Sequence, residues 1–183
     1  MKKYELLKDD TIEVAGKTLF RIKALISFKD IRKGEIGGYV EAERNLSQSD
    51  NAWVTGNAWV CDDACVTGNA RVSDNAWVTG NAWVCDDACV TGNARVSGNA
   101  CVTGNARVSD NAWVETSNDY IVFKNNWSSF RWFTYTKSNK MWRVGCFYGT
   151  GDELIKEAYA DSEESGRKYE LYVNLVKELY RDE

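Results

Sequence analysis

Valine falls at every sixth position between Asp50 and Glu115, and an alanine always precedes it by two residues. This stretch consists of eleven consecutive hexads of the form (Asp/Gly)-(Asn/Asp)-Ala-x-Val-(Thr/Ser/Cys/Glu). Because side chains alternate along an extended strand, Ala and Val share one face and the residue between them points the other way. The polar pairs between the triplets tolerate left-handed backbone. The pattern therefore predicts short strands and corners that wind a triangular coil, with valines inside.

Three hexads to a coil place the outward residues in three columns, one on each face of the prism. The columns are Trp53, Arg71, Cys89 and Arg107; Trp59, Trp77, Arg95 and Trp113; and Cys65, Trp83 and Cys101. In the second column two indoles are predicted to stack, with an arginine between indoles. This row either stabilises an exposed sheet or forms a protein interface, and we take Trp59, Trp77, Arg95 and Trp113 as the interface candidates. The expected assembly is a homo-oligomer, a trimer or a dimer.

Residues 50–73 recur letter for letter as residues 74–97. One more such unit would lengthen the prism and rotate everything beyond it, which a catalytic pocket built between the two ends would rarely tolerate. The repeat is therefore expected to act as a scaffold and spacer, or to multiply one weak contact.

The repeat resembles the hexapeptide-repeat family, which implies a left-handed parallel β-helix. Gly37-Gly38-Tyr39-Val40, Asn45-Leu46-Ser47-Gln48 and the stretch from Trp142 to Phe147 are similar to phage and prophage hexapeptide-repeat proteins, some labelled as transferases on fold alone. The resemblance implies a phage or prophage source. Acyltransferases of the family use histidine as general base, and this chain has no histidine, which argues against that activity.

The two ends are predicted to be separate units that close the prism, because eleven Val-Ala pairs do not offset chain ordering by themselves. Residues 1–49 are expected to form a β cap, with a hairpin over residues 11–25 that turns at Ala15-Gly16 and an irregular first coil near residues 47–49. Residues 116–183 are expected to form a small α+β domain. Its strands are predicted over 120–124, 130–136 and 141–148, followed by two helices, the first opened by a Thr150–Glu153 capping box. The fold class is thus mainly β.

The C-terminal region interleaves cations with flat rings, a mixture that suits stacking on nucleobases and gripping phosphates. The candidate ligand-binding residues are Lys124, Trp127, Arg131, Trp132, Lys137, Lys140, Trp142 and Arg143. The alternative is an aromatic core with solvated charges at alternate strand positions.

Composition narrows the function classes further. A net charge of −4 gives no basic field to coat nucleic acid, and no apolar run is long enough to span a membrane, so a cytoplasmic protein is expected. The Cys-Asp-Asp-Ala-Cys copies do not bring four thiolates together, so neither a metal nor another cofactor is expected. We therefore expect a non-enzymatic, oligomeric binding or scaffold protein that engages a host protein, with a counter-defence role. The alternative is a sponge that sequesters a small nucleotide-type signal.

Overall fold

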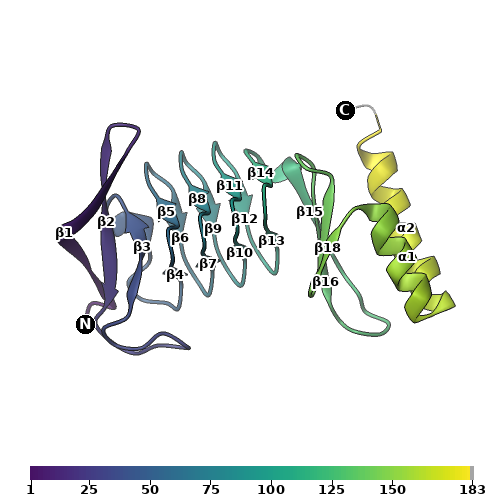
Figure 1. Cartoon of the computed structure of the whole chain (residues 1–183), viewed down its shortest axis with the longest axis horizontal. Helices are drawn as coiled ribbons and strands as arrows, with labels where there is room; N and C mark the ends of the chain where they lie inside the picture. The colour runs from purple at the N-terminus through teal and green to yellow at the C-terminus, as the bar shows by residue number, and fades with distance from the viewer. Residues whose placement is uncertain (182–183) are drawn as a thin grey trace.

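The computed structural model describes residues 1–181, which form an elongated molecule with a β-solenoid between two end modules (Figure 1). The N-terminal sheet strands are β1 (Tyr4–Val14), β2 (Lys17–Ala24) and β3 (Ile36–Val40), followed by the 3-10 turn η1 (Glu43–Asn45). The C-terminal module contains η2 (Ser117–Asp119), β15 (Tyr120–Lys124), β16 (Trp132–Thr136), β17 (Met141–Val144), β18 (Phe147–Gly149), α1 (Gly151–Asp161) and α2 (Glu163–Leu179).

Every predicted hexad forms a two-residue strand at its x-Val positions. These strands are β4 (Trp53–Val54), β5 (Trp59–Val60), β6 (Cys65–Val66), β7 (Arg71–Val72), β8 (Trp77–Val78), β9 (Trp83–Val84), β10 (Cys89–Val90), β11 (Arg95–Val96), β12 (Cys101–Val102), β13 (Arg107–Val108) and β14 (Trp113–Val114). They pair in parallel in three sheets, β4-β7-β10-β13, β5-β8-β11-β14 and β6-β9-β12. The register sets Trp59 beside Trp77, so one coil takes three hexads, as the sequence predicts. The left-handed sense of the coil stays a prediction.

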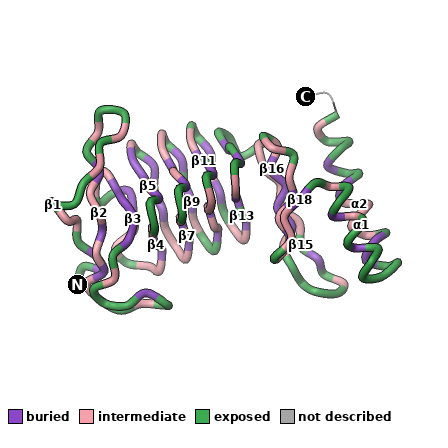
Figure 2. The backbone as a smooth tube through the Cα atoms, viewed as in Figure 1, coloured by how far each residue is buried: buried purple, intermediate pink, exposed green. Residues whose placement is uncertain are grey.

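The side chains inside the prism form a single apolar cluster. Figure 2 shows that buried residues recur along the coils of the solenoid. The hexad valines and alanines are almost completely buried, from Ala52 to Val114. The cluster continues at one end into Tyr4 and Ile22, and at the other end Tyr120 and Val122 pack against it. The end modules therefore extend the solenoid core.

Aspartate lies above glycine at the corners of the prism. The carboxylates of Asp50, Asp62, Asp74 and Asp86 each accept a hydrogen bond from the glycine N–H 18 residues ahead, at 2.6, 3.0, 3.0 and 3.0 Å. The Asp62 and Gly80 backbones have φ of 61° and 70°, values that aspartate and glycine tolerate best. The alternation of Asp and Gly along the hexads therefore gives each carboxylate a donor and separates it from the next carboxylate.

The two ends of the solenoid need opposite kinds of cap. The strand N–H groups donate to carbonyls of the following coil, as Trp59 N does to Ala76 O at 3.1 Å, so the first coil is left with carbonyls and the last with N–H groups. At the first coil, Lys3 Nζ donates to Asp50 O and Ala52 O at 3.1 and 2.8 Å. The Asn45 amide donates to Asp62 O and Ala64 O at 3.0 and 2.8 Å.

At the last coil, hydroxyl oxygens of the C-terminal module accept four of the N–H groups that lack a following coil. The pairs are Cys101 N to Ser117 Oγ at 3.3 Å, Thr103 N to Tyr120 Oη at 3.3 Å, Arg107 N to Thr134 Oγ1 at 2.9 Å and Trp113 N to Ser138 Oγ at 2.7 Å. A side-chain hydroxyl ends the ladder without offering a further strand for pairing. Donors thus close one end and acceptors the other.

The end modules differ from the sequence expectations in two respects. The N-terminal hairpin turns at Ala15-Gly16 as predicted, but its first strand begins at Tyr4, and its sheet continues through β3 onto β5. In the C-terminal module the predicted third strand over 141–148 is wrong, because Gly145 has φ of 58° and divides it into β17 and β18. The antiparallel sheet is β15-β16-β17-β18, and both helices lie on the side away from the solenoid (Figure 1). Among the described residues no helix is long and apolar enough to cross a bilayer.

Candidate functional site

The predicted outward row on the second face is present in the sheet that contains β5, β8, β11 and β14. Trp59 and Trp77 stack with ring centroids 5.1 Å apart and an interplanar angle of 8°. The guanidinium of Arg95 lies 5.0 Å from the Trp77 ring. The Trp113 indole N–H donates to Ser97 Oγ at 3.2 Å. Much of this row is therefore engaged in contacts within the chain, and its role as an oligomer interface stays a prediction.

Trp53, the first member of another predicted outward column, is fully buried. The loop after β2 brings Phe28 to 5.5 Å and the start of β1 brings Tyr4 to 6.3 Å, both edge-on to its ring. Trp53 pairs with Arg71 in the predicted outward column, and the N-terminal cap covers its side chain on the outside of the prism. On the third face Trp83 stays 52% exposed.

A cavity of about 550 Å³ lies between the last coil, the β16–β17 hairpin and α2. Its aromatic walls come from Trp113 of the coil, Tyr135 and Trp142 of the sheet and Tyr180 at the end of α2. The Tyr135 ring lies 5.2 Å from Trp142 and 5.8 Å from Tyr180. The charged residues of the lining are Glu115, Asp119, Lys137, Lys140 and Lys177.

Two of the wall residues offer hydrogen-bond donors that nothing in the described part of the chain accepts. Tyr135 and Trp142 are 7% and 2% exposed, and they are direct cross-strand neighbours. The Tyr135 hydroxyl and the Trp142 indole N–H make no hydrogen bond within residues 1–181, and neither donor atom is completely enclosed, so both remain accessible at the cavity wall. Burial raises the pKa of Tyr135, so the hydroxyl keeps its proton. Two accessible donors side by side on one wall can both be met by acceptors on an incoming molecule.

The structure brings three of the eight candidate ligand residues to this cavity, namely Lys137, Lys140 and Trp142. The other five lie elsewhere. Lys124 Nζ lies 5.3 Å from the Trp132 ring, and Trp127 packs on Tyr172 at 5.5 Å under Lys168. Arg131 lies in a separate hollow beside Cys146 and Glu157, and Arg143 faces Tyr148 across β18.

Sequence reasoning missed Tyr135, and it placed Trp113 and Tyr180 in other roles. All three come from different elements, so no spacing along the chain connects them. A usable signal was strand alternation: Trp142 and Arg143 are adjacent on β17 and so point to opposite faces of the sheet.

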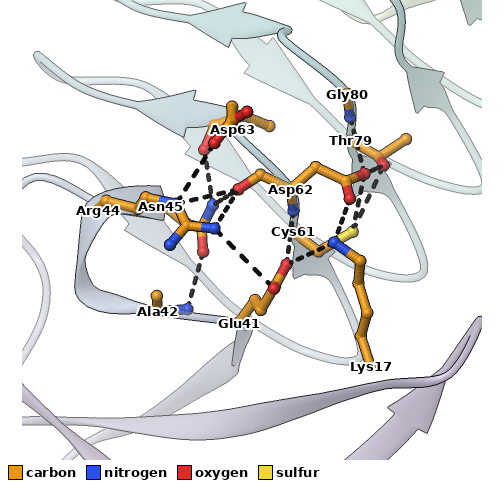
Figure 3. A network of polar contacts seen from close by, with 11 residues as sticks. Lys17, Glu41, Ala42, Arg44, Asn45, Cys61, Asp62, Asp63, Thr79 and Gly80 are labelled. Carbon is orange, nitrogen blue, oxygen red and sulfur yellow. Dashed lines mark hydrogen bonds and ion pairs between the residues drawn. The ribbon is translucent and has the colours of Figure 1, made fainter.

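A second polar cluster joins the N-terminal cap to the first corner of the solenoid (Figure 3). Lys17 Nζ contacts the Asp62 carboxylate and lies 3.1 Å from Glu41 Oε2. Glu41 Oε2 also accepts from Asp62 N at 2.7 Å. The Glu41, Cys61 and Asp62 ligand atoms lie within 4.8 Å of one another, a spacing compatible with a metal, but the lysine ammonium already lies between the two carboxylates. We assign this cluster to fastening the cap.

Asp62→Asn is expected to destabilise the protein by about 1–2 kcal/mol at pH 7, because Lys17, Thr79 and the Gly80 N–H hold the pKa of Asp62 well below its usual range. A carboxyl whose pKa is lower in the folded state than in the unfolded state stabilises the protein at pH values above the unfolded-state pKa. That contribution is lost as the pH falls toward the folded-state pKa. The difference from wild type should therefore shrink below about pH 4, as measured by urea unfolding.

The matched control for this prediction is Asp63→Asn, since the adjacent Asp63 side chain is 79% exposed. It should change stability by no more than about 0.5 kcal/mol at either pH. Equal effects of the two substitutions would contradict the fastening role.

Two stretches of the chain, residues 70–86 and 94–110, match the family model described as the YdcK beta solenoid repeat. Both stretches lie inside the hexad region, and the match supports a β-solenoid repeat independently of the coordinates. Comparison with curated proteins gave no match. The phage source implied by the sequence resemblance stays a prediction.

Proposed function

We propose that this chain is a non-catalytic binding protein whose solenoid sets the distance and the rotation between two end modules. The N-terminal cap (residues 1–49) and the C-terminal module (residues 116–181) are the parts that would contact a partner. One observation carries the proposal: the apolar cluster runs without a break from Tyr4 in the cap to Val114, with Val122 of the C-terminal module packed against it. A continuous close-packed core resists bending and transmits position from end to end.

The partner proposed is a protein large enough to touch both ends. In the phage setting that the sequence resemblance implies, it would be a host protein, and occupying it would serve counter-defence. Two contacts held at a fixed spacing bind more tightly than either contact alone, provided that their geometry matches the partner.

The test uses two lengthened chains beside the native chain. A tandem copy of residues 74–97 adds four hexads, which moves the C-terminal module by about 6 Å and rotates it by about 120°. A tandem copy of residues 62–97 adds six hexads, which is two whole coils, so the module moves by about 10 Å and keeps its rotation. Both insertions keep aspartate above glycine at the corners, and circular dichroism with urea unfolding would verify that each chain folds.

Affinity isolation from cells that make the protein then compares the tagged chains. We expect a protein partner with the native chain, its loss with the rotated chain, and partial retention with the unrotated one. Equal capture by all three chains, or no capture by the native chain above an untagged background, would overturn the spacer proposal.

A further inference from the structure

We propose that the cavity between the last coil, the β16–β17 hairpin and α2 is a binding site for a planar heteroaromatic anion of mononucleotide size. This inference is independent of the spacer role, since it concerns one end module alone. It commits the cavity to a ligand with three properties: a flat ring, hydrogen-bond acceptors on the ring edge, and negative charge.

The flat ring follows from the walls. Trp113 is 46% exposed where it lines the cavity, and Tyr135, Trp142 and Tyr180 present further aromatic surface. The volume of about 550 Å³ lies within the range of small-molecule sites. A heteroaromatic ring gains stacking energy on indole and phenol faces whichever base it belongs to.

The ring-edge acceptors follow from the two unpartnered donors. The Tyr135 hydroxyl and the Trp142 indole N–H are held on neighbouring strands by the β16–β17 register, and both side chains are more than nine-tenths buried. A third aromatic wall residue, Tyr180, differs from them because its hydroxyl already donates to Asn118 O at 3.2 Å. Carbonyl oxygens or ring nitrogens of a base would supply the two missing acceptors.

The negative charge follows from the mouth of the cavity. Its lining holds three lysines, of which Lys177 pairs with Asp152 at 2.9 Å and Lys137 lies 5.2 Å from the Tyr180 ring, so Lys140 is the cation on which the charge preference chiefly rests. The Asp119 carboxylate is turned to the backbone, where it accepts the N–H groups of Glu115 and Thr116 at 2.9 and 2.7 Å. The first residue of α1, Gly151, also lines the cavity.

Glycine at position 151 has a steric reason that supports the same site. A Cβ there would lie 2.6 Å from Val173 Cγ1 and 3.2 Å from Trp142 Nε1. A larger residue would crowd the Trp142 indole N–H, so this glycine keeps that donor accessible.

The experiment is isothermal titration of the full chain with AMP, GMP, CMP and UMP, and with the nucleoside parents of those that bind. We expect saturable binding at one site by at least one monophosphate. Trp142→Phe and Tyr135→Phe, which keep the rings and remove the donors, should each weaken it about five- to tenfold. Lys140→Gln should weaken the monophosphate and leave the nucleoside unchanged.

Matched controls lie on the same sheet and outside the cavity. Trp132→Phe and Lys124→Gln should leave the affinity within about twofold of wild type, because neither side chain lines the site. In parallel, the indole N–H resonance of Trp142, assigned by its loss in Trp142→Phe, should shift when the monophosphate is added. No saturable binding by any of the four monophosphates at low millimolar concentration would overturn the proposal. Binding that the three cavity variants leave unchanged would overturn it equally.

Discussion

Gly68→Ala should destabilise the protein by about 3 kcal/mol, far more than the same substitution at Gly104. Both glycines lie at corners of one edge of the prism, with φ of 70° and 66°. A Cβ at Gly68 would lie 2.8 Å from Asp86 N and 3.1 Å from Asp86 O, which are backbone atoms of the next coil. Because those atoms are fixed by the parallel ladder, the clash cannot be relieved by a side-chain rotation.

Gly104 provides the matched comparison because a Cβ there meets no atom within 4 Å. Its replacement by alanine should cost only the left-handed backbone penalty, about 1 kcal/mol. Urea unfolding of the two variants measures the difference. If both substitutions cost the same, backbone conformation alone, and not contact between coils, decides which corners are glycine.

Lys3→Met is expected to cost about 3 kcal/mol, because it leaves two carbonyls of the first coil without their donor. The Lys3 side chain is 2% exposed, and its ammonium bonds Asp50 O and Ala52 O and lies 5.1 Å from the Phe28 ring. Burial lowers the pKa of Lys3 against the opposing effect of Asp50, so the group is held there at some electrostatic cost. Methionine keeps the apolar stem and removes the donor together with the charge that faces the Asp50 carboxylate at 3.6 Å.

Lys2→Met is the control, since the neighbouring Lys2 side chain is 60% exposed and pairs with Glu43 at the surface. Its effect should stay within about 0.5 kcal/mol. Thermal and urea unfolding would both serve as the measurement. A Lys3→Met variant as stable as Lys2→Met would show that the first coil does not depend on donated hydrogen bonds.

The solenoid could be predicted because its constraint is local and periodic. Ala58 and Val60 must share a face, the corner residues must turn, and repetition every six residues leaves a prism as the simple solution. The order of the outward columns follows from that geometry, and the register of Trp59 on Trp77 and of Cys65 on Trp83 confirms it.

The errors came from contacts between segments far apart in the sequence. Trp53 fits its column, but Phe28, which lies before the solenoid, covers it. The division of the last predicted strand was visible in principle, since an isolated Gly145 inside a strand pattern is a warning of a turn. The cavity was not visible, because Trp113, Tyr135 and Tyr180 converge only when the module docks on the last coil.

The corner alternation bears on how such a gene can change length. Asp and Gly exchange places every hexad from Asp50 to Gly92, so a slip of the duplicated 24-residue block restores the same order at every junction. Gain or loss of one whole coil, 18 residues, would shift that order by an odd number of hexads and stack acid upon acid. Recombination between the two identical blocks can therefore yield longer or shorter proteins that still fold. In each of them the two end modules have a new relative rotation about the solenoid axis.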